Sequence, residues 1–250
     1  LTSQQTYYRQ FRFGDVFAQV KRAPLSLVGQ IRALPGVAAV QARIVMEVTL
    51  DLPGRNEPAT GRLVSLPEHR TAILNDIFLR SGRYPEPAHP DEIIVSEAFA
   101  QANRFTVGDS FQAVVNGRLR QLTIVGIALS PEYIYEVRGG GSIFPDNQRF
   151  GILWMSEKAL GAAFNLDGAC NDLSLTLAPG ASEAEVISRL DGLLADYGGQ
   201  GAYGREEQTS NRFISDEIEQ NKFSSTIVPL IFLGVAAFLL HIILSRLIRM

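Results

Sequence analysis

The chain has 250 residues, with 23 Lys or Arg against 26 Asp or Glu, and a formal net charge of −3. All 26 acidic residues and 20 of the basic ones precede Lys222, so the first 221 residues carry a net charge of −6. This acidic balance excludes a basic surface for nucleic acid. The single cysteine, Cys170, excludes an internal disulfide framework and a cysteine-rich zinc site, and we interpret it as a small buried residue.

The first elements follow the order β-α-β-β. FGDVFAQV (13–20) alternates between the two faces of a strand. PLSLVGQIRALPG (24–36) has apolar residues at helical spacing between two prolines, which predicts a helix that begins near the first proline and ends before the second. Residues 37–52 are rich in β-branched side chains and predict one long strand, and 62–66 predict its return strand.

A matching β-α-β pattern occurs near the end of the water-compatible part. Residues 171–180 alternate as a strand, and 200–206 predict a final strand. Between them, Ser182 and Glu185 have the spacing of a capping box at the start of a helix, which Gly198 ends.

Two such pieces separated by about 100 residues indicate one α+β sandwich that is interrupted by an inserted domain. We therefore predict a discontinuous α+β lobe, residues 1–81 and 165–204, and an inserted β-rich lobe, residues 82–164. The elements predicted within the insert are a strand at 92–96, a short helix at 96–105 capped by Ser96, a hairpin at 109–129 that turns at Asn116-Gly117, a strand at 150–156 and a short helix from Ser156.

Residues 205–224 are polar with a thin apolar stripe, which predicts a stalk helix that leads into the apolar segment after it. The alternative is a surface helix that ends at Ser224-Ser225. No Gly or Pro follows Gly204 until Pro229, which favours the stalk.

The last part of the chain, residues 225–246, is predicted to cross a membrane. From Ile227 to Leu244 there are 18 residues, 13 of them Leu, Ile, Val or Phe, and no Asp or Glu follows Glu219. A helix of this length rises ~27 Å, close to the ~30 Å hydrocarbon core of a bilayer, and its apolar residues favour insertion by about 4–8 kcal/mol. The alternative is a helix buried in a large core. The membrane-spanning residues that we select are Ile227, Leu230, Phe232, Leu233, Phe238, Leu240, Ile243 and Leu244.

The charges that flank this span predict its orientation. Arg246 and Arg249 follow it closely, whereas Lys222 alone precedes it. Because positive residues concentrate on the cytoplasmic side, residues 1–224 are expected outside the cytoplasm. The chain begins at Leu1 without a leading apolar run, and we expect it to be a segment of a longer membrane protein.

No catalytic constellation emerges from the motifs. The glycine-rich stretch 138–145 lacks the GK[ST] ending of a phosphate-binding loop, no G-x-S-x-G occurs, and the three histidines lack paired metal spacing. We expect no enzyme activity, no metal and no cofactor in this chain. Tyr133 and Tyr135 fall on one side of an extended segment, where they form a candidate partner surface or pack into the sandwich.

Several stretches, in this order, resemble the MacB-like periplasmic core domain and the start of an FtsX-like ABC transporter permease. The resemblance spans nearly the whole chain and rests on the stretches DVFAQVKRAP, LPGVAAVQAR, GRLVSLPE, SGRYPEP, DEIIVSEAFAQANRFTVGDSF, NGRLRQLTIVGIALSPEYIY, FGILWMS and IFLGVAAFLL. It implies a porter-like lobe and an inserted β-rich lobe on the periplasmic side of the inner membrane, between the first two membrane helices of a permease. It also implies a second permease copy or half and a cytoplasmic ABC ATPase that binds ATP and Mg²⁺.

Three functions follow from these observations. In the first, the domain couples ATP hydrolysis by the partner subunit to periplasmic work on an exported, lipid or hydrophobic substrate, by mechanotransmission through the stalk. In the second, an FtsX-like regulator binds and switches a periplasmic protein such as a cell-wall hydrolase. In the third, a single membrane span anchors a sensor or ligand-binding module.

Overall fold

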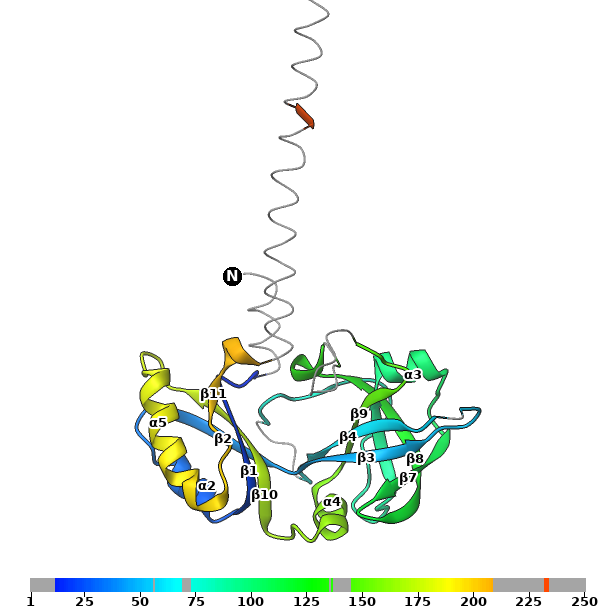
Figure 1. Cartoon of the computed structure of the whole chain (residues 1–250), viewed down its shortest axis with the longest axis horizontal. Coiled ribbons are helices and arrows are strands. Elements are labelled where there is room, and N and C mark those ends of the chain that lie inside the picture. Colours follow the sequence, from blue (N-terminus) through cyan, green and yellow to red (C-terminus); the bar gives the residue numbers. More distant parts are fainter. Residues whose placement is uncertain are drawn as a thin grey trace, which may run out of the picture. The chain divides into compact units, whose positions relative to one another are not determined.

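The computed structural model describes residues 12–55, 57–68, 73–134, 136, 145–208 and 232–233. The chain divides into two units, residues 1–210 and 211–250. The first unit is an α+β fold with two sheets (Figure 1). Its elements are β1 (Val16–Pro24), α2 (Leu27–Arg32), β2 (Val37–Arg43), β3 (Val45–Asp51), β4 (Ala59–Leu66), β5 (Phe78–Gly82), β6 (Glu92–Ser96), α3 (Glu97–Asn103), β7 (Ser110–Val115), β8 (Arg118–Leu129), η1 (Pro131–Tyr133), β9 (Phe150–Ser156), α4 (Glu157–Phe164), β10 (Ala169–Leu177), α5 (Glu183–Leu194), η2 (Ala195–Tyr197), β11 (Tyr203–Gly204) and η3 (Arg205–Glu207).

The first sheet is antiparallel, with strand order β11-β1-β10-β2. Helices α2 and α5 cover one of its faces, because Leu27 and Ile31 of α2 and Leu190 of α5 pack on the apolar residues of β1 and β10. Ser182 caps α5 by accepting a hydrogen bond from the Glu185 N–H at 3.4 Å, as the capping box predicts.

The second sheet has the order β5-β8-β6-β9-β4-β3-β7, and β7 also pairs with β8. This extra pairing closes six of its strands into a ring, whose interior holds a large apolar cluster that includes Leu63, Phe99, Phe111 and Leu153. The β7–β8 hairpin turns at Asn116 (φ 48°) and Gly117 (φ 75°), as predicted.

The single strand predicted over residues 37–52 is two strands, β2 and β3, in the structure. Residues 37–52 are not one strand, because Ile44 interrupts them, and β3 and β4 pair in the second sheet rather than in the first. Where the chain passes from the first sheet to the second, side chains form hydrogen bonds with the backbone groups. Ser65 Oγ accepts from the Ile44 N–H at 2.9 Å, and the Asn171 side chain forms two 2.8 Å hydrogen bonds with the backbone N–H and C=O of Val45. A continuous run of β-branched residues gives no sign of this change of sheet.

Helix α3 begins after Ser96, which is its N-cap residue as predicted. The Ser96 side chain makes no capping hydrogen bond to the helix, and its hydroxyl donates to the Glu136 carboxylate at 2.8 Å.

The predicted stalk and membrane span lie largely outside the described residues. Of the stalk, Arg205–Glu207 form a short 3-10 helix and Gln208 is extended. Of the span, Phe232 and Leu233 are helical and exposed. Within the part of the chain that is described, no helix has both the length and the apolar character needed to cross a bilayer.

Candidate functional site: a buried ion network

A charged cluster lies on the face of the first sheet that α2 and α5 leave uncovered. Leu173 and Leu175 of β10 point to the helices, so the alternating residues Asp172 and Ser174 point to the opposite face. Arg43, the last residue of β2, is directly opposite Asp172 in the antiparallel register. The strand pairing alone therefore places a guanidinium beside a carboxylate at the point where the chain leaves the first sheet.

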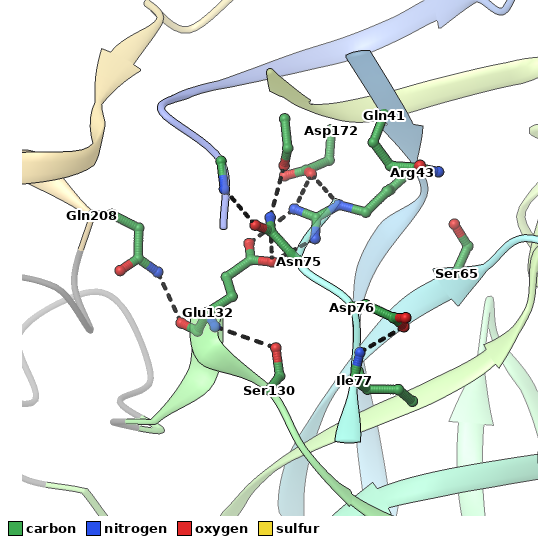
Figure 2. Close-up of polar contacts among 12 residues, drawn as sticks. Gln41, Arg43, Ser65, Asn75, Asp76, Ile77, Ser130, Glu132, Asp172 and Gln208 are labelled. Carbon is green, nitrogen blue, oxygen red and sulfur yellow. Dashed lines mark hydrogen bonds and ion pairs between the residues drawn. The ribbon is translucent and has the colours of Figure 1, made fainter. Parts of the chain in front are cut away.

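Arg43 joins two carboxylates from distant parts of the sequence. Its Nε donates to Asp172 Oδ1 at 2.8 Å, and its Nη2 donates to Glu132 Oε1 at 2.8 Å. A second bond from Nη1 makes the contact with Glu132 bidentate, the geometry in which a guanidinium binds a carboxylate most strongly. Figure 2 shows the guanidinium between the two acids, and the three residues are only 6–8% exposed.

Asn75 completes the network from a loop between β4 and β5. Its amide nitrogen donates to Glu132 Oε2 and to Ser174 Oγ, each at 3.1 Å, and its amide oxygen accepts from the Gly14 N–H at 2.8 Å. The backbone of Asn75 has φ 53°, in the left-handed region that asparagine tolerates better than most residues. We call Arg43, Asn75, Glu132, Asp172 and Ser174 the ion network.

Both ends of the folded unit are tied to the ion network. At the N-terminal end, the Asn75 N–H donates to the backbone oxygen of Arg12 at 3.1 Å. At the C-terminal end, Gln208 Nε2 donates to the backbone oxygen of Glu132 at 2.8 Å (Figure 2).

The two ends are also bound to each other. The Arg205 guanidinium donates to Gly14 O at 2.9 Å and Phe13 O at 3.0 Å, pairs with Asp15, and lies 5.4 Å from the centre of the Phe13 ring. The Arg205 N–H also donates to Asp15 O at 2.8 Å. We call the contacts of Arg205 with residues 13–15 the terminal clamp.

Burial and mutual attraction shift the pKa values of the charged groups in the ion network. Burial alone would lower the pKa of Arg43, but Asp172 and Glu132 outweigh this effect and hold its pKa well above the ordinary value. Burial raises the pKa of Asp172, because Arg43 offsets only part of the lost hydration while Glu132 adds repulsion. One cation thus faces two carboxylates, and the arrangement fixes the relative positions of β2, β10, η1 and the Asn75 loop.

Glu136 is a third buried carboxyl group, and it is hydrogen-bonded to Ser96 rather than to the ion network. It is 4% exposed and accepts the Ser96 hydroxyl. Burial raises its pKa to about 7, and the hydrogen bond opposes this shift only in part.

Of the two tyrosines selected from the sequence, Tyr133 lies within the described residues. Tyr133 is the last residue of η1, is half-buried, and packs its ring edge-on against Trp154 with centroids 6.4 Å apart. Tyr135 lies outside the described residues. The neighbouring Ile134 is 44% exposed. Tyr133 thus packs largely into the domain, and a partner surface at this position stays a prediction.

Sequence reasoning missed the ion network altogether. Its only sequence signals are an arginine inside the run VAAVQARIVMEV and an aspartate inside the alternating NDLSLTL. Within the described ranges, no group of three or more His, Cys, Asp or Glu is arranged to hold a metal ion.

Comparisons with known proteins give structural neighbours only. No protein-family model matches the chain, and no curated protein matches it. The periplasmic region of MacB from Actinobacillus actinomycetemcomitans is similar at 9% identity and TM-score 0.46, covering 87% of this chain and 98% of that one. The extracellular domain of the ABC-type transporter YknZ from Gram-positive bacteria is similar at 12% identity and TM-score 0.47, covering 75% and 98%.

A third neighbour is a domain of a protein described as a permease from Porphyromonas gingivalis, at 14% identity and TM-score 0.40, covering 80% of this chain and 87% of that one. The three neighbours are thus a periplasmic region, the extracellular domain of an ABC-type transporter and a domain of a protein described as a permease.

Proposed function

We propose that this chain is the periplasmic domain and following membrane helix of an inner-membrane ABC transporter permease. In this proposal a cytoplasmic ATPase subunit hydrolyses ATP, and a second permease copy or half completes the transporter. Movement of the membrane segments is conveyed to the domain, which performs export or handles a lipid or hydrophobic substrate.

The observation that carries this proposal is that the first and last described segments of the first unit, near residues 12–15 and 205–208, lie in contact with each other. The terminal clamp binds Arg205 to residues 13–15, and both ends are bonded to the ion network through Arg12 and Gln208. A domain held at two adjacent ends is suited to insertion between two consecutive membrane segments. A displacement that reaches Arg12 or Gln208 is passed to the ion network through a direct hydrogen bond.

The ion network supports the second half of the proposal, the transmission of movement. A mechanical signal is dissipated by flexible connections and conserved by stiff ones. Arg43 and Asp172 belong to the first sheet, whereas Glu132 follows β8 of the second sheet. The bidentate hydrogen bonds between Arg43 and Glu132 therefore connect the two sheets close to Arg12 and Gln208.

The test is an insertion that softens the expected stalk. A Gly-Gly pair placed between Ser224 and Ser225 of the intact permease, reconstituted with its ATPase, should preserve ATP hydrolysis and abolish extraction of a fluorescent lipid. The matched control is an Ala-Ala pair at the same place, which keeps helical propensity while adding the same length. Normal extraction by the Gly-Gly variant would contradict mechanotransmission.

Two other outcomes would redirect the proposal. Stoichiometric capture of a periplasmic hydrolase by the domain, with no lipid extraction by the natural protein, would support the regulatory function instead. A complete reading frame with no further membrane helix would support a sensor with a single span.

A further inference from the structure

A cavity of about 380 Å³ lies at the crossing, where the chain passes from the first sheet to the second. Its walls come from three segments: Ile44 at the crossing itself, residues 67–68 after β4, and parts of residues 157–168, which comprise α4 and the turn that leads to β10. The volume falls within the range of about 300–1,000 Å³ that is usual for small-molecule sites. We call it the crossing cavity.

The floor of the crossing cavity is apolar. Ile44 and Leu166 line it and are only 2% and 8% exposed. Gly161 of α4 also lines it, and a Cβ at this position would lie 3.6 Å from Ile44 Cδ1 and 3.3 Å from Asp167 Oδ1. The missing side chain therefore leaves space beside both an apolar group and a carboxylate.

The rim of the crossing cavity carries more negative than positive charge. The carboxylates of Glu68, Glu157 and Asp167 line it, against the single ammonium group of Lys158. Among the residues that the structure describes, none of these four side chains has a hydrogen-bond or ion-pair partner. The ion network, in contrast, pairs its buried carboxylates with Arg43.

Glu157 is the carboxylate for which the missing partner matters most. It is half-buried in the first turn of α4, and burial together with the charge of Glu68 raises its pKa above the ordinary value. A charge withdrawn from water normally has a compensating partner, and a perturbed carboxyl group in a hollow is a frequent mark of a binding site. A cation inside the cavity would offset both the lost hydration and the repulsion.

We propose that the crossing cavity binds a small organic cation, a protonated amine with an apolar body about as large as a benzyl group. The ammonium group lies against Glu157 and its neighbouring carboxylates, and the apolar body lies on Ile44 and Leu166. A metal ion would leave the apolar floor unused, and within the described ranges no three His, Cys, Asp or Glu residues are arranged to hold one. This inference goes beyond the proposed transport function, because binding needs neither ATP nor movement of the membrane helix.

Ligand-observed NMR on the full 250-residue chain in detergent tests the site. The probe is benzylamine, and benzyl alcohol is its neutral match of the same size, each measured against empty micelles. Benzylamine should bind with a Kd on the order of 1 mM, as expected for so small a ligand. Benzyl alcohol should bind about tenfold more weakly, because it lacks the charge-assisted contact with the carboxylates.

Two adjacent residues of α4 should change benzylamine binding in opposite directions. Glu157→Gln should weaken it about tenfold, since the charge-assisted contact is lost, whereas Lys158→Met should strengthen it about threefold, since a like charge leaves the rim. Gly161→Leu places a side chain in the cavity and should abolish binding of both probes. The control is Glu185→Gln, an exposed acid on α5 outside the cavity, which should bind benzylamine as the natural protein does.

The Glu157 and Lys158 variants keep the test decisive if Gly161→Leu folds poorly, because both change side chains that are not fully buried. The proposal is overturned if these two variants bind benzylamine equally well, or if benzyl alcohol binds the natural protein as tightly as benzylamine. A basic peptide that binds at the cavity while benzylamine does not would assign it to a protein partner and would overturn the proposal as well.

Discussion

Replacing Arg43 with methionine should destabilise the domain more than any exposed arginine would. Methionine roughly fills the space of the arginine stem but leaves Glu132 and Asp172, 6% and 8% exposed, without their cation. Removing one partner of a buried ion pair costs about 3–5 kcal/mol, because the remaining charge stays buried and uncompensated. Domains are stable by only about 5–15 kcal/mol, so this loss is a large part of the total.

Urea unfolding of the full chain in detergent measures this effect. Trp154 is the only tryptophan and is 2% exposed, so its fluorescence reports the unfolding of the second sheet. With an m-value of roughly 2 kcal/mol/M, the unfolding midpoint of Arg43→Met should fall by about 2 M. The control is Arg149→Met, because Arg149 and its partner Glu57 are 59% and 68% exposed at the side chain and such pairs contribute about 0–1 kcal/mol.

A combined variant separates lost charge from lost packing. In Arg43→Met with Glu132→Gln and Asp172→Asn, no charge remains buried without a partner, so we expect at least part of the stability to return. Equal midpoints for Arg43→Met and Arg149→Met would refute the reasoning. A combined variant no more stable than Arg43→Met would show that packing, not charge, causes the loss.

Two further changes test the acid titration and the packing of the domain. The pKa of Glu136 is about 7 in the folded state against an ordinary 4.5, so the folded state holds more protons and the free energy of unfolding should fall, by about 3 kcal/mol, as pH rises from 4.5 through 7. Glu136→Gln should remove this slope in urea unfolding series, and an unchanged slope would contradict the assignment. Gly151→Ala should lower stability by about 1–3 kcal/mol, because the added Cβ would lie 2.4 Å from the Phe99 ring, whereas Gly29→Ala in α2, with nothing within 4 Å, should raise it by about 0.5–1 kcal/mol. Thermal unfolding of both glycine variants checks the pair, and equal effects would contradict the packing argument.

Local signals were enough to predict most elements of the first unit. The capping box at Ser182 and the Asn116-Gly117 turn each depend on a few neighbouring residues, and both are found in the structure. The crossing at Ile44 could not be found in this way, because it depends on Ser65 and Asn171, side chains that are distant in sequence.

The candidate site could not be predicted for the same physical reason. Arg43 and Asp172 are 129 residues apart, and Glu132 lies 89 residues from Arg43, so only the folded topology brings them together. A charged residue within an apolar strand pattern indicates either an exposed edge or a buried ion pair, and sequence spacing does not distinguish the two. The sequence gives no sign of the terminal clamp either, because its pattern places Arg205 at the end of the predicted strand 200–206 and the start of the predicted stalk, not in contact with residues 13–15.

The most direct measurement of mechanotransmission follows the domain itself and needs no knowledge of the cargo. A fluorophore on Gln112→Cys and an acceptor on lipid headgroups would report the distance of the domain from the bilayer in the intact permease, reconstituted with its ATPase. If movement is transmitted through the stalk, ATP changes the energy transfer in the natural protein, and Gly-Gly between Ser224 and Ser225 abolishes the change. Identical transfer with and without ATP in the natural protein, or an undiminished change in the Gly-Gly variant, would contradict mechanotransmission.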